Sequence, residues 1–236
     1  MKLQANNFFD EMANSAFTFE ALTRVWIGLA VDLPKGDRSD LVKIKHAIMD
    51  RTSGVGREIS FTGSITIFRH APEIDEISGI RRIPMSVIAM EEFGYSKELN
   101  TTIQMTADFG LPNFGYTHQV ARDLDVPAEA RMLMNLRLRG VHGPMTGMID
   151  VAVKKELQAT ISSFPFTNGG TAFRHVGNAA NEMKGPDGKV VGYLAFGIMV
   201  PQYQLGNVNP TQGAPRLPAI SDQERSFLRC EVAGLR

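Results

Sequence analysis

The chain has 236 residues, of which 43% are hydrophobic and 21% are charged, so it can bury one sizeable core and is not disordered as a whole. Lys plus Arg and Asp plus Glu each total 25, which gives a formal net charge of +0. A duplex-binding protein carries a basic excess that displaces counterions from phosphates, so no nucleic-acid partner is expected.

The N-terminal third of the chain predicts one strand and up to two short helices. Apolar and polar residues alternate over 17–31, as in a half-buried strand, and residues 6–16 could form a short helix. From Ser39 or Asp40 to about residue 49, the apolar spacing fits a capped helix. A strand also fits that last segment, but we expect the helix.

Period-two alternation is strongest over 58–68, where Gly63 falls on the apolar face and indicates a bulge or a close backbone approach. The alternation recurs over 99–107, 131–139 and 149–161. The last two of these segments flank a connector rich in glycine that also contains proline, which predicts an antiparallel hairpin.

Two further segments are mostly apolar. Pro84 interrupts the run over 80–90, which indicates an edge strand or the start of a strand. The run over 190–200 is apolar on both faces, so we expect a buried central strand.

Together these segments predict a mainly β fold, an antiparallel β-barrel or β-sandwich of roughly eight strands with one or two short helices. Alternation alone does not separate the barrel from the sandwich. We expect residues 1–200 to form a single β domain. Residues 201–236 should form a Pro-rich C-terminal arm with a short terminal helix that begins at Ser221.

The compartment and the cofactor are predicted from what the sequence lacks. Cys230 is the single cysteine, which excludes a disulfide within the chain and favours a reducing compartment. The start has no apolar signal-peptide region, and no 18 apolar residues run together. Phosphate-loop, dinucleotide-binding and zinc motifs are absent. We therefore expect a cytoplasmic protein with no membrane association and no cofactor.

Four residues in two segments are candidate catalytic residues. Tyr116 and His118, two positions apart in an expected loop, could act as proton donor and base. Arg174 could hold a carboxylate or phosphate as a fork, and His175 could move a proton. An aromatic loop that packs on the barrel mouth and a polar strand near a flexible turn are the simpler interpretations of the two segments. The four residues form one acid–base site only if the segments converge.

Three other positions suggest chemistry less directly. His70 stands just before three acidic residues and could bind a divalent metal, although an acidic, solvated turn is the simpler interpretation. His142 falls in the predicted hairpin turn and should be exposed. Lys155 lies on the apolar face of 149–161, where a desolvated lysine could form a Schiff base with a carbonyl compound. We expect instead that a bulge at Lys154–Lys155 turns it outward or that the side chain snorkels.

Two functions from different classes follow. The first, which we favour, is a protein that binds a small-molecule ligand. It could be a cofactor-independent acid–base enzyme (an isomerase, cyclase or lyase) acting on a carbonyl or hydrophobic substrate. The alternative is a structural or assembly subunit whose C-terminal arm lies over a neighbour. Zero net charge favours self-association, so a homo-oligomer is expected in either case.

Overall fold

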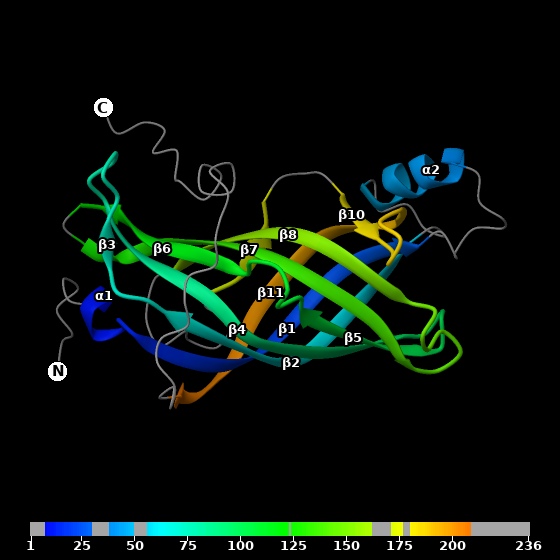
Figure 1. Ribbon diagram of the computed structural model, residues 1–236, viewed down its shortest axis with the longest axis horizontal. Coiled ribbons are helices and arrows are strands. Elements are labelled where there is room, and N and C mark those ends of the chain that lie inside the picture. Colours follow the sequence, from blue (N-terminus) through cyan, green and yellow to red (C-terminus); the bar gives the residue numbers. More distant parts are fainter. Residues whose placement is uncertain are drawn as a thin grey trace.

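The computed structural model describes residues 8–29, 38–49, 56–122, 124–161, 171–176 and 180–208. They form two short helices, α1 (Phe8–Glu11) and α2 (Arg38–Met49), and one 11-stranded sheet (Figure 1). The strands are β1 (Ser15–Leu29), β2 (Arg57–Arg69), β3 (Glu73–Ile74), β4 (Arg81–Ser96), β5 (Thr101–Ala107), β6 (Phe114–Ala121), β7 (Leu124–His142), β8 (Asp150–Ile161), β9 (Phe173–His175), β10 (Asn181–Lys184) and β11 (Val190–Val208). The mainly β fold class is confirmed, and α2 forms where a helix was expected over a strand.

Strand pairing closes the sheet into an antiparallel barrel. β11, β1, β2 and β4 are neighbours in that order, and β4 then pairs with both β5 and β6, which both pair with β7. β7 pairs with β8, which pairs with both β9 and β10, and these two strands return to β11. The wall of the described barrel thus has eight positions, two of them shared by a pair of short strands. This closure decides for the barrel over the sandwich.

Alternate residues of the long strands point into the barrel and make one large core. Phe17 and Phe19 of β1, Phe61 of β2, Met132 of β7 and Phe173 of β9 are each at most 1% exposed. Phe9 of α1 and Met12, which follows the helix, pack against this core. The outer face carries a second, smaller cluster, in which α2 packs on β11 through Ile44, Tyr193 and Ala195. No helix of the described chain is long and apolar enough to cross a membrane.

Of the two positions expected for Pro84, the edge strand is wrong, but Pro84 does lie near the start of a strand, as the fourth residue of β4. Pro84 lies within β4, between β2 and β6, and opposite Tyr116. Its carbonyl accepts a hydrogen bond from the His70 backbone N–H on the β2 side. The N–H that proline lacks would point to that same side, just beyond the last β2–β4 pair of Arg69 with Met85. The missing N–H thus falls where the β2–β4 ladder ends, and Pro84 and His70 share one backbone hydrogen bond instead of two.

Two other expected boundaries also change. The segment around Tyr116 and His118, expected as a loop, is strand β6. Residues 201–208, expected at the start of an irregular arm, continue β11 and pair with β1 as far as Val208 opposite Ala16. Residues 209–236, with the predicted terminal helix, lie outside the described residues. The division into a β domain and an arm, like the homo-oligomer, stays a prediction.

Gly63 allows a close backbone approach in the barrel wall, one of its two predicted roles. It lies on the inward face of β2, opposite Glu92 of β4, and its β2–β4 pairing is in regular register. A Cβ on Gly63 would overlap the Glu91 carbonyl oxygen and come within 2.6 Å of the Glu92 Cα. Both are backbone atoms that cannot move aside independently, so only glycine fits.

We predict that Gly63→Ala lowers the free energy of unfolding by about 3 kcal/mol or more, because the strands must separate to admit the methyl group. Urea denaturation followed by circular dichroism measures the loss. Gly185→Ala is the matched control, since its nearest neighbour is the Asp187 side chain at 3.3 Å, which can move. Equal losses in the two variants would contradict this explanation of Gly63.

Candidate functional site

The barrel wall is interrupted at two positions where two short strands replace one long strand. The first, the β5–β6 split, is sealed by the connection between these strands. The Val87 N–H donates to the Asn113 carbonyl, and the Asp108 N–H donates to the Asn135 carbonyl. The Asn135 amide donates to the Pro112 carbonyl at 2.6 Å. Backbone and amide groups thus replace the missing strand.

The second interruption, the β9–β10 split, lies on the other side of β7 and β8. β8 pairs with β10 through Ala152 and Val153 and with β9 through Leu157 and Gln158. β11 likewise pairs with β10 over 190–194 and with β9 at 198–199. Residues 154–156 of β8 and 195–197 of β11 therefore border a stretch of wall without a described strand. Residues 177–179, between β9 and β10, lie outside the described residues.

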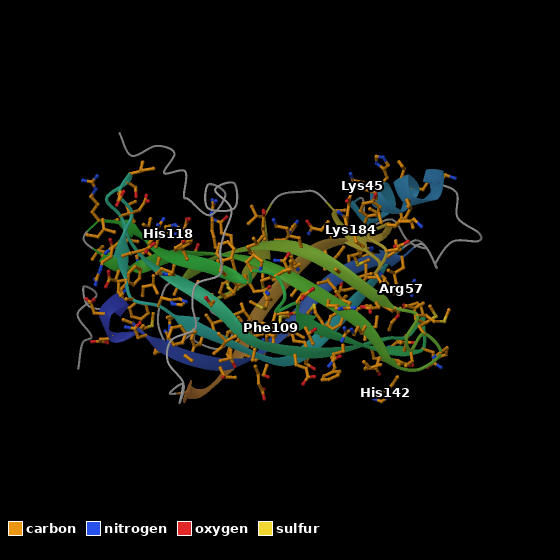
Figure 2. All side chains as sticks on the ribbon, viewed as in Figure 1. Lys45, Arg57, Phe109, His118, His142 and Lys184 are labelled. Carbon is orange, nitrogen blue, oxygen red and sulfur yellow. The ribbon has the colours of Figure 1, made fainter. Side chains whose placement is uncertain are left out.

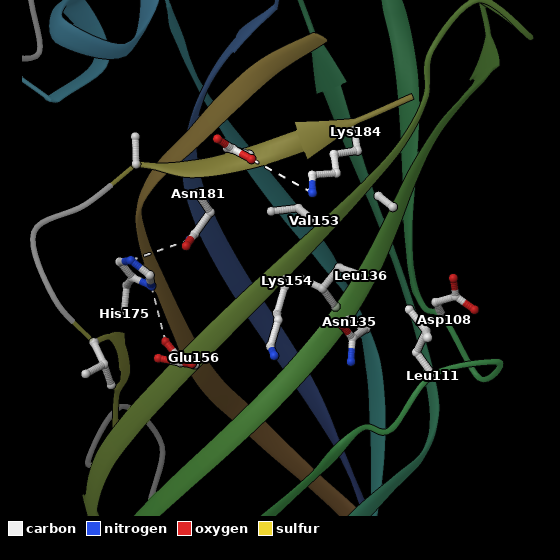
Figure 3. Close-up of a pocket in the computed structure, with 14 residues that line it drawn as sticks. Asp108, Leu111, Asn135, Leu136, Val153, Lys154, Glu156, His175, Asn181 and Lys184 are labelled. Atoms are coloured by element: carbon white, nitrogen blue, oxygen red, sulfur yellow. Dashed lines mark hydrogen bonds and ion pairs between the residues drawn. The ribbon is translucent and has the colours of Figure 1, made fainter. Parts of the chain in front are cut away.

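An outer groove of about 600 Å³ lies on the surface of the barrel beside this split (Figure 3). Its walls come from His175 and Asn181 at the split and from Asp108 and Leu111 at the far side, across β7 and β8. Lys154, Glu156 and Asn135 are among the polar residues that line it. The groove thus offers positively and negatively charged side chains together with hydrogen-bond donors and acceptors.

His175 is held in one tautomer at the edge of the groove. Its Nδ1 lies 3.2 Å from the Glu156 carbonyl oxygen, and its Nε2 lies 3.4 Å from the Asn181 amide nitrogen. A carbonyl oxygen only accepts, so Nδ1 carries the proton, while the Asn181 NH₂ donates to Nε2. The 3.4 Å contact is long for a hydrogen bond, so Nε2 is a proton acceptor that a ligand could take over.

Glu156 is the second proton-exchanging group of the groove. Partial burial raises the pKa of its carboxyl group, although the positive charges of Lys154 and Arg131 oppose the shift. A carboxyl with a raised pKa can act as a general acid or base nearer to neutral pH than an exposed one. Imidazole and carboxyl chemistry therefore occur together in the groove.

The four sequence-predicted site residues do not converge. Tyr116, Arg131, Gln158 and Arg174 lie directly opposite one another in turn across β6, β7, β8 and β9. Three strand spacings of about 4.8 Å put Tyr116 roughly 14 Å from Arg174. Arg174 is exposed, and of the four only His175 lines the groove. A single site made of all four is therefore not formed, and the catalytic role of each stays a prediction.

Tyr116 and His118 belong to a separate charged cluster on the outer face of β6. The Arg82 guanidinium lies 4.5 Å from the centroid of the Tyr116 ring, and its Nε donates to Glu73 at 2.7 Å. The His118 Nε2 lies 3.6 Å from a Glu129 carboxylate oxygen. Burial lowers the pKa of His118, although Glu129 opposes this shift. This cluster holds β3, β4, β6 and β7 together.

The other two histidines singled out by the sequence stand apart. His70 lies 2.9 Å from the Ser86 hydroxyl, whereas Glu73 pairs with Arg82. Across the described ranges, no three His, Cys, Asp or Glu side chains are grouped to hold a metal ion. His142 is exposed at the end of β7, far along the barrel from His118 (Figure 2).

Lys155 points into the barrel, so the expected outward turn is wrong. β7 and β8 pair without a bulge there, with Met134 opposite Lys155 and Asn135 opposite Lys154. Lys155 is 2% exposed. A Cβ on Gly197 of β11 would overlap the Lys155 Nζ and come within 2.5 Å of its Cε. Gly197 thus leaves the space that the amine occupies, and a side chain there would displace the end of Lys155.

Glu92 of β4 is the acidic partner of Lys155 in the interior, and the sequence interpretation missed it. It is 0% exposed, and one oxygen accepts a hydrogen bond from the Thr23 hydroxyl at 2.9 Å. The other oxygen is buried and has no hydrogen-bond partner among the residues that the structure describes. The sequence did contain a signal, because Glu92 has the period-two spacing that puts it on the same face as Met90 and Gly94. The strand expected over 80–90 ended before it.

Burial shifts both interior groups toward their neutral forms. It raises the pKa of Glu92 to about 8, opposed by the Thr23 hydrogen bond and the charge of Lys155. It lowers the pKa of Lys155 to about 8, opposed by the charge of Glu92. An amine and a carboxyl that both titrate near neutral pH can exchange protons with a bound molecule.

Comparison with known proteins supports the fold. No family model and no curated protein sequence matches the chain. Among solved structures, DynF from the dynemicin biosynthesis pathway of Micromonospora chersina has a TM-score of 0.57 and 13% sequence identity, with 84% of each chain covered. At this identity the likeness shows a shared fold and carries no residue roles across.

The raised pKa of Glu92 predicts a stability that depends on pH. Its pKa is about 8 in the folded chain against an ordinary value of 4.5. The folded state therefore binds this proton more tightly, and the stabilisation is complete below about pH 4.5 and is lost as pH rises to about 8. We expect the free energy of unfolding to fall by up to about 1.4 kcal/mol per pH unit in this window.

Urea denaturation between pH 5 and pH 8 measures this slope. Glu92→Gln cannot ionise and should flatten it, whereas Glu91→Gln, a change at the exposed neighbour on the outer face, should keep it. The same slope in wild type and Glu92→Gln would show that Glu92 is not its source.

Proposed function

We propose that this protein binds a small polar organic molecule in the outer groove and that His175 transfers a proton to or from it. The observation that supports this best is the meeting of the His175 Nε2, the Asn181 amide and Glu156 in one groove of about 600 Å³. This volume is within the range of small-molecule sites in proteins. The groove also lies beside the β9–β10 split, where the His175 ring and the Val176 N–H both approach the Glu156 carbonyl oxygen.

The groove favours acid–base chemistry on a carbonyl compound. The neutral His175 can remove a proton next to a carbonyl group, and Glu156 can return a proton to another atom of the same molecule. Lys154 offers a positive charge for an oxygen that becomes negative in between. Isomerisation, cyclisation and lyase reactions of this kind move protons and carbon bonds without electron transfer.

The similar fold of DynF supports the same class of function. DynF comes from a biosynthesis pathway, so this barrel fold occurs in a protein associated with small-molecule synthesis. A role in the metabolism of a small organic compound is therefore consistent with both the groove and the fold.

The groove residues can be tested by ligand screening. Native mass spectrometry of the protein purified without added ligand first reveals any bound compound. Thermal-shift screening with small hydroxy and keto acids then supplies ligands for calorimetry. We expect His175→Ala and Asn181→Leu to weaken binding about tenfold or more, the equivalent of about 1.4 kcal/mol from a lost hydrogen bond.

The exposed His142 provides the control. His142→Ala should bind each ligand as wild type does, and circular dichroism should show that all variants are folded. For any ligand that is converted, His175→Ala should abolish turnover. Ligands that bind His175→Ala and Asn181→Leu as tightly as wild type would place the binding site elsewhere.

A further inference from the structure

A row of buried side chains crosses the outer face of the barrel. Its members come from β2, β4, β6 and β7 and lie opposite one another in turn: Phe68, Ser86, Phe114 and Leu133. Ile67, Met85 and Met132, each next to a member of the row, belong to the interior core. The four side chains, which we call the outer row, therefore point away from the interior. Each is at most 6% exposed.

Elsewhere the same strands expose their outer face. Ser64 of β2 lies four residues before Phe68 and points to the same side of the sheet. It is opposite Glu20 of β1 and Glu91 of β4, and all three of these residues are exposed. The barrel wall thus does not bury its own outward side chains, so other atoms cover the outer row.

The described residues cover the outer row at its β2 end. The centroid of the His70 ring lies 4.9 Å from that of Phe68, and the His70 Nε2 lies 2.9 Å from the Ser86 hydroxyl. At the other end, Phe114 and Leu133 form a cluster with Tyr116, and this cluster has no further buried apolar member in the described part of the chain. The β6–β7 end of the row is therefore where a covering segment is needed.

The last described residue lies in line with the outer row. Ala16 of β1 is opposite Phe68 on one side and Val208 of β11 on the other, and it is 0% exposed. Residues 209–236 thus begin beside the row. Five strand spacings of about 4.8 Å, roughly 24 Å in all, lead from Val208 to Leu133. About eight extended residues span this distance.

The sequence after Val208 suits such a position. Residues 217–220 (Leu-Pro-Ala-Ile) are the first run of four apolar residues there, and they follow the eight that the crossing needs. Pro210 and Pro215 within the crossing have no N–H, so fewer backbone donors need partners against an apolar surface. Proline-rich segments commonly bind surfaces lined by aromatic side chains, which the outer row provides.

We propose that the outer row is the docking surface of the chain's own C-terminal segment, in which residues 209–216 cross the row and residues 217–220 pack on Phe114 and Leu133. Docking within one chain costs little loop-closure entropy, because β11 already holds the start of the segment beside the row. Burial of apolar surface stabilises the docked form. Leu133 is opposite Glu156 of the outer groove, so the docked segment ends beside that groove. The proposal does not depend on what the groove binds.

Limited proteolysis of the full chain tests the docking. Trypsin cleaves after Arg216, within the docked segment, and mass spectrometry follows this cleavage over time. A docked segment must open before it is cut, so we expect Phe68→Ser and Leu133→Ser each to speed cleavage about tenfold or more. The control is Phe93→Ser, which changes an outward residue of β4 that is 41% exposed and should leave the rate unchanged. Circular dichroism checks that the variants are folded. Equal rates in wild type and both row variants would overturn the proposal.

Photo-cross-linking tests the same docking with the barrel unchanged. Ile220→Cys is combined with Cys230→Ser, which removes the single native thiol, so that a benzophenone maleimide labels only position 220. After irradiation, we expect cross-links to the peptides that contain Phe114 and Leu133. Cross-links confined to other parts of the barrel would overturn the proposal.

The same experiment separates docking within one chain from docking on a second copy. Isotope-labelled and unlabelled protein are mixed in equal amounts before irradiation. We expect each cross-linked pair of peptides to be fully labelled or fully unlabelled. Pairs that combine a labelled with an unlabelled peptide would show that the segment comes from a neighbouring copy, and they would overturn docking within the chain.

Discussion

The antiparallel pairing of β1 with β11 is the constraint on which the rest of the structure depends. It joins the first long strand to the last, from Ala16 opposite Val208 to Leu29 opposite Gly192. Without it the sheet would have two long open edges, and its inward phenylalanines and methionines would face water. Three register shifts in this pairing increase the local bend and twist, which helps the sheet to close. Only a closed wall makes an interior in which Lys155 and Glu92 are desolvated.

That interior contains a costly pair. Removing a lysine and a glutamate from water costs several kcal/mol for each charge, and an apolar pair of similar volume would fill the space without this cost. The barrel limits the penalty by shifting both groups toward neutrality and by hydrogen bonding Glu92 to Thr23. The cost falls inside the closed barrel, where Glu92 is 0% and Lys155 2% exposed and water solvates neither group.

The two interruptions of the wall show how similar topology leads to different surfaces. At the β5–β6 split, Asn113 and Asn135 complete the hydrogen bonding, and the wall is sealed. At the β9–β10 split, the Glu156 carbonyl accepts from the Val176 N–H and from the His175 ring instead of from a full strand. A titratable side chain thus takes the place of a peptide group. This substitution puts an imidazole at the edge of the outer groove.

The sequence by itself determined the β class and most strand positions, because side-chain alternation is a local property of each strand. It also singled out His175 as a candidate proton-transfer residue from its side-chain chemistry. Closure of the barrel, the regular β7–β8 pairing that keeps Lys155 on the apolar face, and its partnership with Glu92 were decided only by the tertiary structure. Each depends on strands that lie far apart in the chain, and such pairings leave no local pattern. Residues 201–208 show the same limit. Their proline and glycine predict an irregular arm, yet β1 offers them a row of backbone partners, and they form a strand.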